Sequence, residues 1–211
     1  MTAADVAALE QTLSAPDGWL PAALRRLAQD PVAGRLPEDD RPALARAARA
    51  AGAAMAGRWQ RREPAEQTLS ELGVEIVEDE GEARWGPLVH HARYTAPPAR
   101  VTLYRRPLAT LERVLVHLDV REVILAHELF HHLVQVGGAP AAVRPRVTTL
   151  RLGRWHRETV VRAAEEIAAA GFAGAWYGVD EAPELLDAVT VRIADGSDTH
   201  AAALRGDLAA G

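Results

Sequence analysis

Residues 119–135, DVREVILAHELFHHLVQ, contain an H-E-x-x-H motif at His127, Glu128 and His131. On an α-helix, residues four apart lie on the same side, so the two imidazoles would face one point. Two imidazoles in this arrangement suit two of the three protein ligands of a catalytic Zn²⁺. Glu128 would lie about 100° further round the helix, where it flanks the metal and can take a proton from water that the metal activates. The motif therefore predicts two metal ligands and a general base.

Local signals predict that this stretch is helical. Asp119 followed by Glu122 resembles a capping box, and Gly137 with Gly138 is a typical helix stop. The inward stripe follows a 3.6-residue period and consists of Val123, Ile124, His127, Phe130, His131 and Val134. The alternative is a core helix whose histidines are satisfied by hydrogen bonds, because the motif can also arise by chance in a chain with eight histidines.

Composition excludes several classes of function. The net charge of −5 gives no reason to expect nucleic acid as the main partner. No apolar run has the length of a membrane span, and the N-terminal residues are acidic where a signal peptide is basic and then apolar. We therefore expect no membrane association and a cytoplasmic location.

The chain has neither cysteine nor lysine. Without cysteine it has no disulfide, no thiolate nucleophile and no cysteine-based zinc site. Without lysine it has no Schiff-base chemistry and no lysine for a phosphate-binding loop. The chain also has no G-x-G-x-x-G fingerprint and no G-x-S-x-G elbow. Metal-assisted catalysis is almost the only chemistry that remains.

Periodicity predicts an α+β fold that is mostly helical, with a small mixed or antiparallel sheet packed on the motif helix. We expect helices within residues 3–30, 40–62, 64–72, 107–118, 155–171 and 184–191, and strands at 74–78, 88–94 and 100–104. Residues 140–154 show no strong period. The expected organisation is a helical extension at 1–62, a catalytic core at 63–194 and a flexible tail at 195–211.

The strand before the motif helix is a candidate for substrate binding. Prolines flank it on the N-terminal side at 97 and 98 and beyond its end at 107, which favours an edge strand. An extended peptide can add itself to an open sheet edge. The candidate substrate-binding residues of this strand are Arg100, Val101, Thr102, Leu103 and Tyr104.

A catalytic zinc needs a third protein ligand. On a helical wheel Glu165 lies about 160° from Ile167, away from the inward face, whereas Glu166 lies only about 100° from it, at its border. The small residues Ala163, Ala169 and Ala170 would let this helix approach the motif helix closely. We therefore predict Glu166 as the third ligand, with Glu165 in reserve and His156 ranked third.

The H-E-L-F-H motif, followed by Glu166-Ile167-Ala168-Ala169-Ala170-Gly171-Phe172-Ala173, resembles the gluzincin division of zinc metallopeptidases. The nearest likeness is to the small cytoplasmic ImmA/IrrE-type proteins, over about residues 74–175. The resemblance implies a minimal zincin-like core, Glu166 as third zinc ligand and the strand at 100–104 as a wall of the cleft. Two positions depart from the family pattern. Ala170 stands where a hydrogen-bonding side chain is common, and His132 is polar and is expected to face water or a substrate.

The expected function is hydrolysis of a peptide bond in a peptide or protein substrate, with Zn²⁺ as cofactor. Candidate donors for the developing oxyanion are His132, His156 and Tyr177. One alternative is a non-catalytic, zinc-stabilised module that binds a protein, and another is a helical interaction protein without metal. The identity of the substrate and the oligomeric state stay open.

Overall fold

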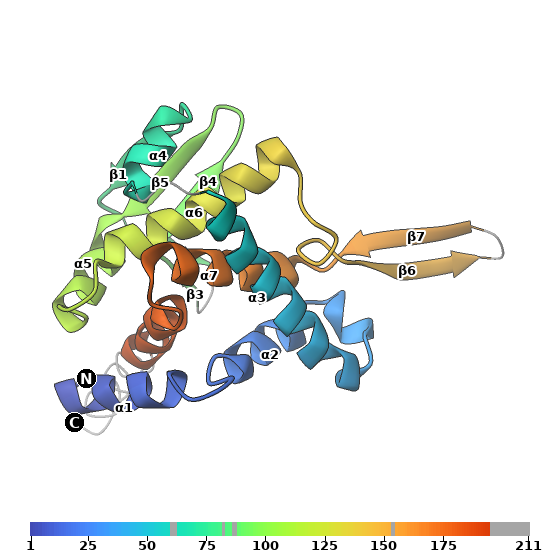
Figure 1. Cartoon of the computed structure of the whole chain (residues 1–211), viewed down its shortest axis with the longest axis horizontal. Helices are drawn as coiled ribbons and strands as arrows, with labels where there is room; N and C mark the ends of the chain where they lie inside the picture. The colour runs from blue at the N-terminus through green and yellow to red at the C-terminus, as the bar shows by residue number, and fades with distance from the viewer. Residues whose placement is uncertain (60–62, 82, 86–87, 153–154, 195–211) are drawn as a thin grey trace, which may run out of the picture.

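The apolar helix α6 (Val120–Gly137) runs through the middle of the fold and holds the H-E-x-x-H motif (Figure 1). The computed structural model describes residues 1–59, 63–81, 83–85, 88–152 and 155–194. The fold is α+β and mostly helical, with a small mixed sheet, as the sequence predicted. Of the helices within these ranges, none combines the length and apolar character needed to cross a lipid bilayer.

The ends of α6 confirm the predicted helix. The side chain of Asp119 accepts a hydrogen bond from the backbone N–H of Glu122 at 3.0 Å, and Gly138 ends the helix with a φ of 78°. Only half of the capping box forms. The carboxylate of Glu122 instead accepts hydrogen bonds from the backbone N–H of Ala65 and from the indole N–H of Trp176. It thereby joins α6 to two neighbouring helices.

The mixed sheet has the strand order β1–β5–β4. Its strands are β1 (Glu75–Asp79), β4 (Ala92–Thr95) and β5 (Arg100–Tyr104). β5 pairs in parallel with β1 and antiparallel with β4, so it is the central strand. The prediction of an edge position for residues 100–104 is therefore wrong. The prolines at 97 and 98 lie in the turn before β5 and not in the strand. They therefore remove no backbone N–H donor from β5, which can pair along both of its edges.

The segment predicted as one strand at 88–94 forms two strands instead. β3 (Leu88–His90) pairs with β2 (Ala83–Trp85) in a small antiparallel sheet of its own. After a break at His91 the chain enters β4, which is one of the two outer strands of the mixed sheet within the described part of the chain. β4 lies against α6. The strand beside the motif helix is thus β4.

A second departure from the predictions lies after α6. Residues expected to be irregular form β6 (Arg146–Leu152), and the start of the predicted helix at 155–171 forms β7 (Trp155–Val160). The two strands pair in an antiparallel hairpin that projects from the body of the molecule (Figure 1). Pairing with the adjacent strand β6 overrides the helical pattern of residues 155–160. Helix α7 (Arg162–Tyr177) consequently begins seven residues later than predicted.

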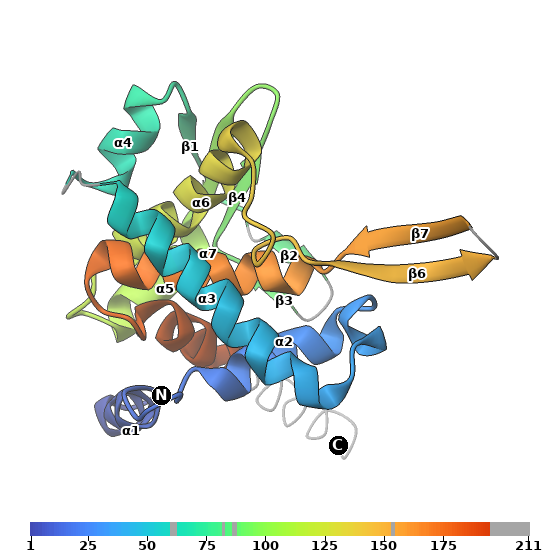
Figure 2. The ribbon, with the colours of Figure 1, turned by 45° about the vertical axis from the view of Figure 1, so that its right-hand side comes forward.

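The N-terminal region is helical, as predicted. It forms α1 (Ala3–Leu13), α2 (Leu20–Gln29), the short turns η1 (Ala33–Arg35) and η2 (Glu38–Asp40), and α3 (Arg41–Arg58). Figures 1 and 2 both show α3 crossing α7, and these two helices pack extensively against each other. Fully buried alanines of α3, among them Ala45 and Ala48, belong to the same core as α6 and α7.

Three further helices complete the fold. α4 (Ala65–Glu71) lies within the predicted range 64–72 and ends before Gly73, which has a positive φ. α5 (Arg105–Val114) leads into α6. Residues 182–194 are helical, where a shorter helix at 184–191 was expected. The predicted tail at 195–211 lies outside the described residues, as do residues 60–62 at the expected end of the third helix.

The close approach of α3 to α7 gives a test of the fold. A Cβ atom at Gly52 would overlap the backbone carbonyl of Ala168, whereas a Cβ atom at Gly57 of the same helix would meet nothing within 4 Å. We expect Gly52→Ala to destabilise the protein by about 3 kcal/mol, because two backbones must separate. Gly57→Ala should be neutral or stabilise by up to about 1 kcal/mol. Urea unfolding of both variants measures the difference, and equal midpoints would contradict this packing.

Candidate metal centre

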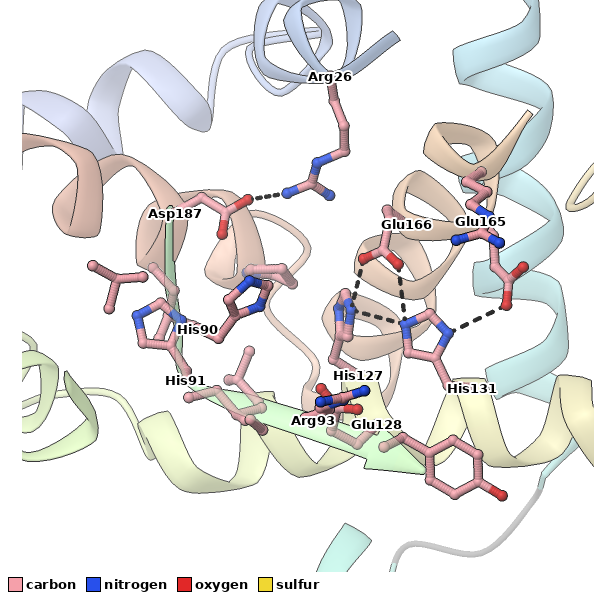
Figure 3. A pocket seen from close by; sticks show the side chains of 18 of the residues that line it. Arg26, His90, His91, Arg93, His127, Glu128, His131, Glu165, Glu166 and Asp187 are labelled. Carbon is pink, nitrogen blue, oxygen red and sulfur yellow. Dashed lines mark hydrogen bonds and ion pairs between the residues drawn. The ribbon is translucent and has the colours of Figure 1, made fainter. Parts of the chain in front are cut away.

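The two motif histidines lie on the same side of α6 and face a cavity of about 960 Å³ (Figure 3). Their Nε2 atoms are 3.2 Å apart. Both side chains are mostly buried, with 24% of His127 and 17% of His131 exposed. This is the arrangement expected of residues one helical turn apart.

Glu166 approaches both imidazoles from α7. Its Oε2 lies 3.3 Å from Nε2 of His127, and its Oε1 lies 3.5 Å from Nε2 of His131. One ligand atom from each of the three residues can be chosen so that all lie within 4.8 Å of one another. Two imidazole nitrogens and a carboxylate that converge in this way form a donor set suited to Zn²⁺ with an open coordination position. The structure thus brings together the three residues predicted as ligands.

Glu165 does not point toward this meeting place of ligand atoms. Its Oε1 lies 3.3 Å from Nδ1 of His131, on the opposite edge of that imidazole from Glu166. Arg144 donates to both of its carboxylate oxygens, from Nε to Oε2 at 2.7 Å and from Nη2 to Oε1 at 3.0 Å. The helical wheel placed Glu165 on the outer face because it assumed a single inward face. α7 instead packs against both α3 and α6, and Ala163 and Ala169 are buried as well as Ile167.

Glu128 lines the same cavity and is only 8% exposed. It makes no hydrogen bond or ion pair with any other residue in the described part of the chain. Its negative charge does act on His131. A buried carboxylate without a structural partner, which opens into a cavity beside two imidazoles, is available to exchange a proton.

The carboxylates around the imidazoles change the ionisation of the site. Burial of His131 disfavours its charged form, but the hydrogen bond to Glu165 and the charges of Glu166 and Glu128 outweigh it and raise its pKa to about 9. Burial opposes ionisation of Glu165, but His131 and Arg144 hold its pKa at about 2. Burial likewise opposes ionisation of Glu166, yet His127 and His131 lower its pKa. Both glutamates are therefore anionic at neutral pH.

The cavity walls come from several parts of the chain. β4 contributes Arg93 and Tyr94, while α2 contributes Arg26 and the helix at 182–194 contributes Asp187. Arg26 and Asp187 form an ion pair across from the three ligand residues (Figure 3). The residues of β5 are not among those that line the cavity. Sequence reasoning missed the role of β4, although it identified residues 88–94 as extended.

The three predicted oxyanion donors lie elsewhere. His132 is buried, not facing water, and its Nδ1 lies 3.0 Å from the hydroxyl oxygen of Tyr94. The hydroxyl of Tyr177 accepts a hydrogen bond from the backbone N–H of Asp119, at the start of α6. His156 is exposed on β7 of the projecting hairpin and is not in the group of described side chains that could hold a metal ion. None of these three side chains lines the cavity.

The helix that bears Glu165 and Glu166 depends on the N-terminal region for its cap. Val161, which precedes α7, provides no side-chain hydrogen bond. The cap comes from Asp30, whose Oδ2 accepts a hydrogen bond from the backbone N–H of Ala163 at 2.9 Å, while its Oδ1 accepts from Val32 and Ala33. Burial opposes ionisation of Asp30, but these backbone donors lower its pKa. An anionic cap suits a helix N-terminus.

Comparison with protein-family models, with curated proteins and with solved structures finds no match for this chain. The resemblance to gluzincins therefore rests on the motif and on the second-helix glutamate alone.

The raised pKa of His131 can be measured in the metal-free protein. NMR titration of the imidazole after treatment with a chelator should give a pKa of about 9. The folded-state pKa exceeds the reference value of 6.5, so the stabilisation from protonated His131 is complete below pH 6.5 and disappears as the pH rises through about 9. Glu165→Gln should lower this pKa, because it removes the hydrogen-bonded charge. The control is Glu158→Gln, which removes an exposed carboxylate. If His131 had the same pKa in Glu165→Gln as in this control, Glu165 would not be a cause of the raised pKa.

The cap of α7 gives a second test. Asp30→Ala leaves three backbone N–H groups without their acceptor and should destabilise the protein by about 2 kcal/mol. Asp39→Ala removes the same charge from an exposed position and should have little effect. Because folding lowers the pKa of Asp30, its contribution is present above pH 3.8 and is lost as the pH falls through the folded-state pKa. The stability difference between the two variants should therefore shrink at low pH. A constant difference would exclude an anionic cap.

Proposed function

We propose that this protein is a zinc-dependent peptidase, in which His127, His131 and Glu166 hold the metal and Glu128 is the general base. Two observations support the proposal. Three ligand atoms from α6 and α7 converge in one cavity. The remaining carboxylate of the motif lines that cavity with no hydrogen-bond or ion-pair partner in the described part of the chain. The second observation carries the catalytic part, since a purely structural metal site does not need Glu128.

Bound Zn²⁺ would supply a Lewis acid that lowers the pKa of water to about 7 and polarises a carbonyl group. Glu128 then takes a proton from the attacking water and later delivers it to the leaving amine. The proton that the water loses is therefore the one that the amine gains, and Glu128 ends the reaction unchanged. Glu128 lines the cavity that the three proposed ligands also line, so its carboxylate can reach the reacting atoms there. Glu166 and the two histidines contribute by fixing where those atoms lie.

The substrate in this proposal is an extended peptide segment that lies along β4. β4 is one of the two outer strands of the mixed sheet in the described residues, contacts α6 and contributes residues 92–94 to the cavity wall. An extended segment can hydrogen-bond to such an edge while its scissile bond faces the metal ligands. This assignment moves the substrate strand from residues 100–104, which form the central strand, to β4.

The decisive variant is Glu128→Gln, which keeps the shape of the side chain and removes its basicity. We expect it to retain one equivalent of zinc by elemental analysis and to lose peptide hydrolysis by at least about 100-fold. Cleavage is measured by mass spectrometry on a mixed peptide library, with Glu158→Gln on the exposed hairpin as matched control.

The other outcomes distinguish the alternatives. Zinc retained together with full activity in Glu128→Gln would refute the base assignment. One equivalent of zinc in the wild type with no cleavage of any peptide would indicate a non-catalytic zinc module. Wild-type protein that binds no zinc would refute the metal site itself.

A further inference from the structure

Glu165 lies between a predicted metal ligand and an arginine, and both of its oxygens are in use. Oε1 accepts from Nδ1–H of His131 and from Arg144, and Oε2 accepts from Arg144. The side chain is only 15% exposed. A surface charge on a solvated helix would not be enclosed in this way.

We propose that Glu165, held by Arg144, is a positioning residue that fixes the tautomer and the ring orientation of His131. A metal ligand must be a neutral imidazole. An anionic carboxylate can only accept hydrogen bonds, so in that neutral form the remaining proton of His131 must sit on Nδ1. The lone pair then lies on Nε2, which faces His127 and Glu166. This inference rests on the proposed metal site and adds to it a role for two residues outside the ligand set.

The helix geometry explains how two consecutive glutamates serve one imidazole. Successive side chains on a helix diverge by about 100°, so Glu165 and Glu166 cannot both point to the same ligand position. Here Glu166 lies near the Nε2 edge of His131 and Glu165 near its Nδ1 edge. The ring is therefore held from both sides by one turn of α7 (Figure 3).

Arg144 gives this arrangement its rigidity. Its two-point contact with the carboxylate defines the plane of Glu165, which a single hydrogen bond would leave free to rotate. The positive charge of Arg144 also balances the negative charge of Glu165, which lies beside the carboxylates of Glu128 and Glu166 in the cavity. Arg144 precedes the β6–β7 hairpin, and its backbone N–H donates to the carbonyl of Pro140, so the loop after α6 places it.

The test compares zinc affinity across a graded series, measured by competition with a chromophoric chelator. Glu165→Ala should weaken zinc binding by about 10- to 100-fold, as removal of such an outer hydrogen bond typically does. Glu165→Gln, which keeps an acceptor but loses the charge, and Arg144→Gln should give intermediate losses. Glu158→Ala, which removes an exposed carboxylate, should bind as the wild type does. Circular dichroism confirms that each variant is folded.

A spectroscopic readout separates positioning from a general effect on stability. In the Co²⁺-substituted wild type, the ring N–H of His131 should give a shifted NMR signal that exchanges slowly with water. Glu165→Ala should make that exchange fast while the signal of His127 stays unchanged. Wild-type affinity together with an unchanged His131 signal in Glu165→Ala would overturn the positioning role. Failure of the wild type to bind either metal would instead overturn the proposed function, and this inference with it.

Discussion

The close packing of α7 between α3 and α6 is the constraint on which the whole site depends. Gly52 allows the backbone of α3 to approach Ala168, and Gly171 allows α7 to approach Arg49. On the other side, Phe130 of α6 packs against Phe172 of α7 with tilted rings whose centroids are 5.6 Å apart. Because protein interiors are densely packed and resist deformation, this contact sets how far Glu166 stands from the two histidines.

Charge balance is the second constraint. Glu128, Glu165 and Glu166 place three carboxylates around two imidazoles in a largely buried region, and carboxylates rarely occupy such sites without cations. Arg144 neutralises Glu165 directly, while Arg26 acts on Glu166 through its charge and pairs with Asp187. The raised pKa of His131 reflects the same excess of negative charge. A divalent cation between the three proposed ligands would meet the remaining demand.

The N-terminal helices contribute to the site, although their sequence contains no recognisable motif. Asp30 caps the helix that bears Glu165 and Glu166, and Arg26 lines the cavity opposite the ligands. The alanine-rich α3 provides the surface against which α7 is held. Residues 1–58 therefore share one core and one cavity with the rest of the fold.

The sequence by itself determined the motif helix and the relative positions of the three motif residues on it. The cap at Asp119, the 3.6-residue period and the stop at Gly138 all lie within about twenty residues, so local interactions were enough to place His127, Glu128 and His131 relative to one another. The choice of Glu166 as third candidate also followed from helical geometry. The pairing of β6 with β7 is local in the sequence, but the pattern of neither segment showed it. Only tertiary structure decided the central position of β5 and two contacts of α7: that of Glu165 with Arg144, 21 residues away, and that of Ala163 with Asp30, 133 residues away. The sequence pattern of one segment does not show which other segment it will contact, because strand pairing and contacts between side chains depend on the packing of the complete fold.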